Sequence, residues 1–554
     1  MTSAHALRVR FASAVLAAGA IALALVSPGG APVRAAQKDK AGGDAPNALA
    51  YLGAPPGKDA GKVAPGIGAC RGCHSGAGAG QAGGFVKTYK SDEFCRLNEA
   101  VTWDEKDIHS AALLRLDSEL GKAMEKVLQK HRPAGYKVSQ APECLTCHSV
   151  DMAPEKPLAQ KTPDDFATAA GGVNCTACHG LRQTWQVEHY EEPLQKGQPM
   201  PWRAKDPAYK YSKGMHDLRN PVVKAKLCVS CHVGNAAEGK IVTHEIYAAG
   251  HPPLPPFEMS AYMQGEPRHW GYPSELKYFD TVKKDDRWKL FHFHAGADEA
   301  YLARHYAAGA IAAIQAEAEL LLADATRAAK DGDILDYARF DCYSCHHELR
   351  YPSDRQKRGY DGPPGRAPLR AAAGVPAWVV AENAKTSPSA AVKALAPGFG
   401  PQWGKLKAAA LERPFGKPAS VQTEAKALWN WCESFLKEQG DTAEPLFPPA
   451  QAKNLSDAVV AAAMGREALA DPEAAMVLTW GALALTREGG MKHDPVKLKV
   501  LDGIISENVR IAPFDRMEGK AMVPVQAQFP PRMKRVATFE ADTYLPAFKG
   551  VFGK

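Results

Sequence analysis

The feature that most constrains this chain of 554 residues is a short motif, Cys-x-x-Cys-His, that occurs five times. The copies hold ten of the twelve cysteines, and they are Cys70, Cys73 and His74; Cys144, Cys147 and His148; Cys175, Cys178 and His179; Cys228, Cys231 and His232; and Cys342, Cys345 and His346. Two thiols three residues apart can each form a thioether to one edge of a porphyrin, and the next imidazole can then reach the iron. The pattern therefore predicts five covalently attached c-type haems.

Zinc ribbons, redox dithiols and disulfides also use Cys-x-x-Cys pairs. A four-thiolate zinc site takes the pairs two at a time, usually about 12 to 20 residues apart, and needs no following histidine. In this sequence the pairs are odd in number, lie 31 to 114 residues apart, and are each followed by histidine. These differences favour haem over zinc or disulfides.

The N-terminus has the pattern of a secretory signal peptide. Arg8 and Arg10 precede an uncharged apolar run over residues 11–26, and small residues near Ala35 form a cleavage site. We therefore expect residues 1–35 to be removed and the mature protein to be soluble and periplasmic, the compartment type in which c-type haem is attached. The alternative is an uncleaved membrane anchor, because the run is slightly long for a signal core and short for a span.

The charge balance gives no indication of a nucleic-acid partner. The formal net charge is +7, and removal of the signal peptide, with three arginines and no acid, leaves +4. The propionates of five haems would bring this to about −6. No basic stripe is present, and the apolar run 306–323 carries Gln315, Glu317 and Glu319, so we expect no membrane span after the signal.

Composition divides the rest of the chain into four parts. Residues 36–66 are rich in Gly, Ala, Lys and Pro and predict a disordered linker, and residues 67–357 form the pentahaem cytochrome c domain. Residues 358–418, rich in Pro and Gly at their start, predict a second linker. Residues 419–554 predict a haem-free helical domain, with helices at 422–438, 454–469, 472–487 and 495–508.

Two helices are expected inside the haem region. Thr102 and Glu105 form a capping box, and the apolar positions that follow, from Ile108 to Val127, continue one helix with His109 on its apolar stripe. A second long helix is expected over residues 298–330. Strand signals are sparse, so the predicted fold class is mainly α with long loops wrapped around haems.

The second axial ligand of each iron decides between an electron carrier and an enzyme. Beyond the five motif histidines and His5, twelve histidines remain, and five would suffice. The residues expected to serve as distal ligands are His109, His189, His244, His251 and His347. His269 is a weaker candidate, and we expect His131, His216, His292, His294, His305 and His493 to be surface or packing residues.

Local context supports each choice. An imidazole on an apolar helix face, as at His109, needs a polar partner, and Pro252 stiffens the backbone beside His251. His244 opens the short apolar segment that leads to His251, and His189 follows the third motif by ten residues. His347 directly follows a motif histidine, so it would have to ligate the iron of a neighbouring haem. Cys95 and Cys432, outside the motifs, are expected to be buried thiols or a mutual disulfide.

Residues 67–352 resemble the cytochrome c-554-type multihaem family, which has the cytochrome c-552/4 domain and is distantly related to hydroxylamine oxidoreductase and pentahaem nitrite reductase. The matching segments are Trp103 to Ser110, Gly172 to Gly180 with His189, Asp217 to Arg219, Cys228 to Gly234, His244 to Pro252, Arg268 to Trp270, and Asp341 to His347. The resemblance implies a periplasmic electron carrier with haems in stacked and perpendicular pairs, mostly ligated by two histidines. It also implies distal roles for His109 and His251.

Two departures limit this resemblance. Five haems exceed the four of the smallest relatives, and the Cys-x-x-Cys-Lys motif that nitrite reductases use at their catalytic haem is absent. We therefore expect a carrier of single electrons between a quinol-linked donor and a downstream acceptor protein. The alternative is a multihaem oxidoreductase that acts on hydroxylamine, nitrite, nitric oxide or an oxidised sulfur compound such as tetrathionate at one open-sided haem. In a third hypothesis, the C-terminal helices form a docking module.

Overall fold

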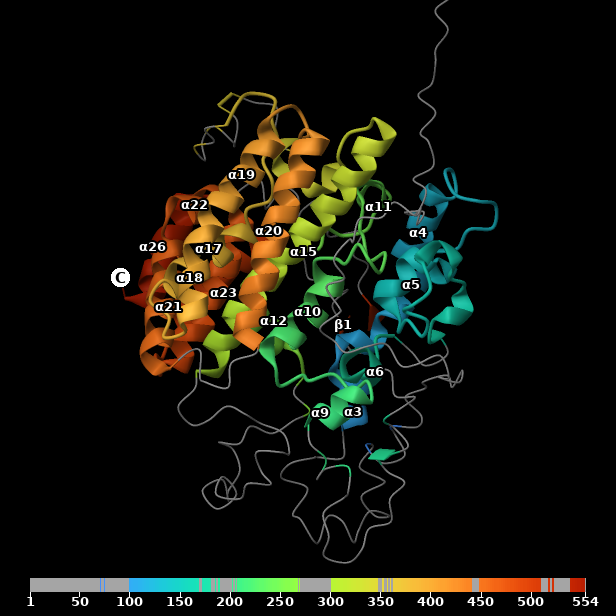
Figure 1. Ribbon diagram of the computed structural model, residues 1–554, viewed down its shortest axis with the longest axis horizontal. Helices are drawn as coiled ribbons and strands as arrows, with labels where there is room; N and C mark the ends of the chain where they lie inside the picture. Colours follow the sequence, from blue (N-terminus) through green and yellow to red (C-terminus); the bar gives the residue numbers. More distant parts are fainter. Residues whose placement is uncertain are drawn as a thin grey trace, which may run out of the picture. The chain divides into compact units, whose positions relative to one another are not determined.

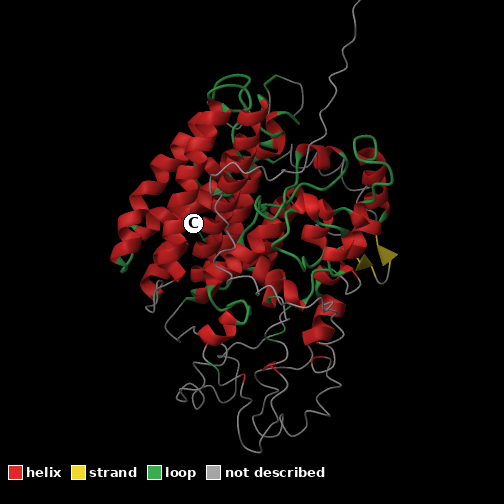
Figure 2. Ribbon diagram, turned by 45° about the vertical axis from the view of Figure 1, so that its right-hand side comes forward, coloured by secondary structure: helices red, strands yellow, loops and turns green. Residues whose placement is uncertain are grey.

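The computed structural model describes residues 70, 74, 99–168, 172–180, 185, 188–189, 202, 205, 207–267, 269, 300–346, 351–352, 356, 359, 362–440, 448–509, 517–518, 521–522 and 539–553. All of them belong to one unit, residues 35–554. The described part is mainly helical, which confirms the predicted fold class (Figure 2). Its one sheet is a two-stranded antiparallel ribbon of β1 (Met517–Glu518) and β2 (Ala521–Met522).

The helices fall into two groups along the chain. Those of the predicted haem region are α3 (Glu99–Lys106), α4 (Glu119–Leu128), α5 (Pro142–His148), α6 (Cys175–His179), α9 (Pro207–Ser212), α10 (Pro221–His232), α11 (His244–Ala248), α12 (Met259–Gly265) and α15 (Tyr301–Asp331). Those that follow are α17 (Gly374–Ala384), α18 (Ala390–Leu395), α19 (Phe399–Leu411), α20 (Pro418–Gly440), α21 (Pro449–Ala463), α22 (Arg466–Ala470), α23 (Pro472–Glu488), α24 (Pro495–Val509) and α26 (Ala541–Phe552).

Helix α15 is the central element of the fold. Its alanine-rich surface lets neighbouring helices approach closely, and it packs against α10, α17 and α20, as Figure 1 shows for α20. Glu488 accepts hydrogen bonds from the backbone N–H groups of Leu302 and Ala303 and thereby caps the N-terminus of α15. Gly332, with a φ of 67°, ends the helix.

Helix α15 is also the one described helix that is long and apolar enough to cross a membrane. However, 83% of its most apolar window is buried inside the protein. This is the pattern of a core helix, in agreement with the expectation that the run over residues 306–323 is not a membrane span.

One hydrophobic core joins the predicted haem domain to the C-terminal helices. It runs from Val222 of α10 through α15 to Phe552 of α26. A smaller core, which includes Leu116, Leu128 and Leu145, holds α4 against α5. The boundary predicted at residue 357 is therefore not a break in the packing.

The prediction of a second linker over residues 358–418 is wrong for most of this segment. It contains α17, α18 and α19, and their buried residues, such as Val379, Trp403 and Leu406, belong to the large core. Pro and Gly occur within or beside these short helices and hide their periodicity in the sequence. The helices expected further on are present as α20, α21, α23 and α24, although the one expected over 454–469 is divided at Gly465 between α21 and α22.

The helix expected to begin at Thr102 is also different in the structure. Thr102 lies within α3, and two short 3₁₀ turns, Ile108–Ala111 and Leu113–Asp117, separate α3 from α4. The Asp107 carboxylate accepts a hydrogen bond from the His109 N–H, and Ser118 caps α4 through the Gly121 N–H. These side chains compete for backbone donors that a continuous helix would need. His109 therefore lies on a capped turn instead of a helical stripe.

Candidate metal centres

Four of the five motifs lie on described helical turns. The second motif ends α5, the third makes up the whole of α6, the fourth ends α10, and the fifth begins on the 3₁₀ turn Cys342–Ser344. A helical turn places residues three and four positions apart on one face. Both cysteines and the histidine of a motif therefore point to the same side. Of the first motif, Cys70 and His74 are described, whereas Cys73 lies outside the described residues, as do His347 and Cys95.

Each motif histidine lies opposite one histidine from outside the motifs. The ring centroids are 6.2 Å apart for His74 and His189, 6.4 Å for His148 and His251, 6.3 Å for His179 and His269, 6.1 Å for His232 and His109, and 6.3 Å for His346 and His244. No histidine is used twice. Four of the five distal candidates from the sequence, His109, His189, His244 and His251, occur in these pairs.

The spacing fits one iron between the two rings of each pair. A ligating imidazole nitrogen lies about 2.0–2.1 Å from a transition metal, and its ring centroid lies about 1.1 Å further back, so two imidazoles on opposite sides of one metal have centroids about 6.2 Å apart. The angles between the ring planes range from 12° to 83°. Direct ring-to-ring contact would favour particular angles. A constant distance with variable angles therefore indicates a spacer of fixed length.

Hydrogen bonds fix which nitrogen faces the gap. Nδ1 of His148 donates to the Ala112 carbonyl, and Nδ1 of His251 donates to the Pro252 carbonyl, both at 2.7 Å. Because Nδ1 carries the proton in these rings, Nε2 is left with a lone pair for a metal.

Two further motif pairs are oriented by carboxylates. Nδ1 of His74 lies 2.8 Å from Oε2 of Glu99, and Nδ1 of His109 lies 2.9 Å from Oδ1 of Asp107. A carboxylate partner makes the imidazole a more basic ligand than a carbonyl partner does.

Burial lowers the pKa of four of these imidazoles, those of His148, His179, His232 and His251, and so favours the neutral form that binds a metal. It lowers the pKa of both His179 and His232 to about 3, and neighbouring histidines contribute in the same direction. It lowers the pKa of His251 to about 4. His109 is the exception, because burial is outweighed by the hydrogen bond and charge of Asp107, which raise its pKa.

His269 is the ligand candidate that sequence reasoning ranked too low. It lies opposite His179, and the only sequence signal for it was its place in the segment Arg268 to Trp270. The remaining described histidines have other partners or positions. Nδ1 of His216 donates to the Cys178 carbonyl, Nδ1 of His305 donates to the Tyr301 carbonyl, His493 bonds to Thr486, and His131 is exposed. His292 and His294 lie outside the described residues.

The motifs approach one another in pairs. A hydrogen bond joins the thiols of Cys70 and Cys175, from the first and third motifs, and raises the pKa of Cys175. A second joins Cys147 and Cys231, from the second and fourth motifs, and raises the pKa of Cys147.

Weaker contacts link these pairs and the fifth motif. Burial raises the pKa of Cys178, and the charges of Cys228 and Cys231 add to this effect, so the third and fourth motifs are neighbours. Tyr247 lies between His251 and the fifth motif. Its ring centroid is 6.0 Å from that of His251, and it interacts electrostatically with Cys342.

The other arrangements of cysteine find no support in the described residues. The described residues contain no group of three or more His, Cys, Asp or Glu side chains that could hold a metal ion by themselves. Cys432 is a free thiol, fully buried in α20. Its expected burial is thus observed.

Comparison with known proteins gives one match. A family model described as cytochrome c554 and c-prime matches residues 69–180, the segment that contains the first three motifs. No curated protein and no solved structure matches the chain.

Proposed function

We propose that the protein is a multihaem electron carrier with five covalently bound haems, because residues 69–180 match the family model described as cytochrome c554 and c-prime. In this proposal each motif supplies two thioethers and one axial histidine. His189, His251, His269, His109 and His244 supply the second axial ligands of the first to fifth motifs, in that order.

The observation that carries the proposal is the set of five histidine pairs with ring centroids 6.1 to 6.4 Å apart. Two imidazoles leave no axial position for a substrate. Bound haem c supplies a single-electron couple, and six strong ligands in both oxidation states suit simple electron transfer. The pairs therefore favour a carrier over the alternative of an oxidoreductase with one open-sided haem.

The chain's own residues hold the proposed ligands in place. His179 and His232 are half-buried, and their surroundings lower the pKa of each. The Nδ1 hydrogen bonds of His74, His109, His148 and His251 fix ring orientation. Fixed ring orientations keep reorganisation small when the charge of the centre changes by one.

The contacts between motifs support one order for electron movement. The first motif contacts the third, the third neighbours the fourth, and the fourth contacts the second. Tyr247 and the segment 244–251, which carries the distal ligands of both the second and fifth motifs, connect the last step. We propose that electrons move between the ends of the series first, third, fourth, second and fifth.

The partners in this proposal are redox proteins, a quinol-linked donor and a downstream acceptor. We also propose that the protein is exported with the aid of residues 1–35 and works in the periplasm, where haem c is attached. The charge of about −6 estimated for the loaded protein argues against nucleic acid as a partner.

The test uses protein produced in a host that matures c-type cytochromes. The intact mass should equal the chain from residue 36 onward plus five haems. The spectrum of the oxidised protein should show low-spin haem alone and should not change when cyanide or nitrite is added.

Other results would point elsewhere. A mass increase below five haems would reject the haem count, and a colourless preparation that holds zinc would reject haem at the motifs. A high-spin signal that shifts with nitrite would support the oxidoreductase alternative instead.

A further inference from the structure

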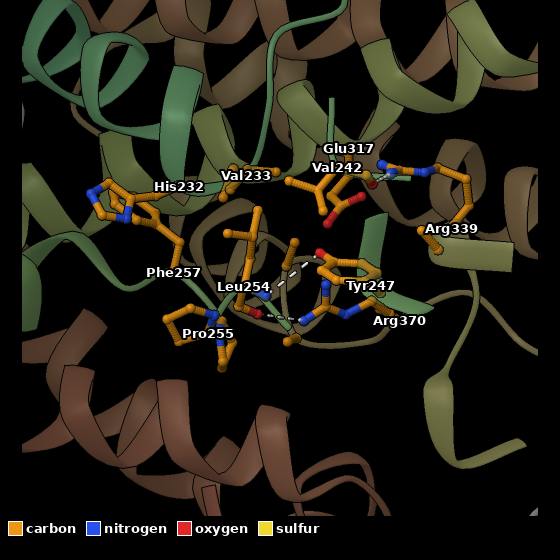
Figure 3. A pocket seen from close by; sticks show the side chains of 15 residues that line it. His232, Val233, Val242, Tyr247, Leu254, Pro255, Phe257, Glu317, Arg339 and Arg370 are labelled. Carbon is orange, nitrogen blue, oxygen red and sulfur yellow. Dashed lines mark hydrogen bonds between the residues drawn. The ribbon is translucent and has the colours of Figure 1, made fainter. Parts of the chain in front are cut away.

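A small cavity lies between the proposed haem sites and the C-terminal helices (Figure 3). Its walls come from the end of α10 at His232, the segment from Val242 to Phe257, α15 at Glu317, and the two arginines Arg339 and Arg370. The cavity has room for about two water molecules, so it suits a group as small as a carboxylate.

The cavity adjoins three of the proposed haem sites. His232 of the fourth motif lines it directly, and Tyr247 lies with its ring centroid 6.0 Å from that of His251. Arg370 interacts electrostatically with Cys342 of the fifth motif. Any group that projects from a haem edge in this region therefore has this cavity to enter.

Arg339 is a buried cation with no carboxylate in direct contact among the described residues, although the charge of Asp324 interacts with it at longer range. Only 7% of its surface is exposed, and Nη2 donates one hydrogen bond, to the Val242 carbonyl at 2.9 Å. Among the residues that the structure describes, no carboxylate lies within ion-pair distance of its guanidinium, and Nε and Nη1 have no acceptor. A buried guanidinium is costly unless an anion pairs with it.

Arg370 and Tyr247 add donors to the same cavity. Arg370 forms an ion pair with Glu473 in which Nε and Nη2 donate to Oε2 at 3.1 and 2.9 Å. Nη2 also donates to the Leu254 carbonyl. Its Nη1 is not used by any described acceptor. The Tyr247 hydroxyl accepts a hydrogen bond from the Leu254 N–H at 3.5 Å and can still donate its own proton. In Figure 3 these side chains lie on the same side of the cavity as Arg339.

One carboxylate, Glu317, also lines the cavity. Its charge interacts with Arg370, but it forms no hydrogen bond or ion pair within the described part of the chain. Glu317 thus forms no ion pair with Arg339 in this structure. Because it lines the same cavity, a test must distinguish the Glu317 carboxylate from the carboxylate of a bound group.

We propose that Arg339, with Tyr247 and the free edge of Arg370, binds a carboxylate of a haem propionate in this cavity. The inference rests on the proposed function, because it needs a haem beside the cavity. A guanidinium suits a carboxylate because its planar donors match the two oxygens.

The experiment labels the haem and leaves the protein unlabelled. Cells that mature the full chain are supplied with 5-aminolevulinate carrying ¹³C at the carboxyl that becomes the propionate carboxyl. Infrared spectra of the holoprotein then report propionates separately from Glu317 and every other protein acid. Arg339→Gln should move part of the labelled carboxylate band to the position of protonated acid near neutral pH, and Arg339→Lys should restore most of it.

Arg327→Gln is the matched control. It removes the same charge from a side chain that is paired with Asp324 and Asp333 and does not line the cavity. Its labelled spectrum should equal that of the unmodified protein. If Arg339→Gln does not mature, the comparison of Arg339→Lys with the unmodified protein, read as a smaller shift of the same band, takes its place.

Two results would overturn the inference while leaving the proposed function intact. In the first, Arg339→Gln carries five low-spin haems with an unchanged labelled spectrum. In the second, calorimetric titration of the unmodified holoprotein with sodium formate shows binding that Arg339→Gln abolishes, which would assign the cavity to a soluble carboxylate. A haem count below five would instead be a failure of the proposed function.

Discussion

His269 lies opposite His179 with the two ring centroids 6.3 Å apart, although ninety residues of sequence separate them. This pair completes a set in which every motif histidine has a partner. His347, which the sequence suggested as a distal ligand, lies outside the described residues and has no motif assigned to it in this proposal.

Substitution of His269 therefore distinguishes the two candidates. His269→Ala should open one axial position and produce one high-spin haem that binds cyanide, because the haem of the third motif loses its second imidazole. His347→Ala should leave all haems low-spin. Electron paramagnetic resonance of the oxidised proteins measures both. A high-spin signal in His347→Ala together with none in His269→Ala would reverse the assignment.

The Asp107 carboxylate should lower the potential of one haem. Its hydrogen bond to Nδ1 of His109 makes the imidazole a stronger donor and stabilises the oxidised iron. Asp107→Asn should raise one of the potentials by up to about 60 mV, which is a tenfold change for a one-electron couple. Spectroelectrochemical titration measures this, and Asp117→Asn, at an exposed position, is the control. Five unchanged potentials would contradict the role of Asp107.

The ion pair between buried Lys226 and half-buried Glu433 should be sensitive to replacement of Glu433 but not to replacement of Lys226. Lys226 is 2% exposed, and its Nζ lies 2.7 Å from Oε2 of Glu433, which also accepts a hydrogen bond from Gln315. Glu433→Leu removes the carboxylate that lies against a buried ammonium and should cost about 3 kcal/mol of unfolding free energy, whereas Lys226→Met should be nearly neutral.

Urea unfolding of the holoprotein measures both changes. Asp457→Ala breaks the exposed pair with Lys453 and should change the free energy of unfolding by less than about 0.5 kcal/mol. Equal losses in Glu433→Leu and Lys226→Met would show that packing, and not the unpaired charge, determines the effect.

Glu258 should make stability fall as pH rises. Burial raises its pKa to about 7 from an ordinary value of 4.5, against hydrogen bonds from the N–H groups of Ser260 and Ala261. The folded state therefore holds this proton more tightly than the unfolded state between these values. Its contribution is most favourable below about pH 4.5 and declines through pH 7, by about 3 kcal/mol in all.

Glu258→Gln should remove this part of the pH dependence. The difference in unfolding free energy between the unmodified protein and the variant should change between about pH 5 and pH 8, with the variant relatively more stable at the higher pH. Glu155→Gln, at an exposed position, is the control. A constant difference between the two proteins would show that Glu258 ionises at its ordinary pKa.

The sequence predicted the local chemistry of this protein better than its long-range packing. The spacing within each motif is set by one helical turn, so the positions of the thiols and imidazoles follow from neighbouring residues alone. The position of the proposed distal ligand His269 does not follow from neighbouring residues. Its partner His179 is far away in sequence, and no local spacing sets the distance between them. Local patterns also located α15, α20 and α23 but missed α17 and α19, where Gly374 and the prolines interrupt the periodicity while burial against α15 and α20 stabilises the helices.

The shared core around α15 has a consequence for how the molecule comes apart. Its apolar surface contacts both α10, which ends in a motif histidine, and α20 of the haem-free part. A chain that ended at residue 357 would expose this apolar surface to water and would therefore be prone to aggregate. The parts of the chain before and after residue 357 are thus expected to fold and unfold as one unit.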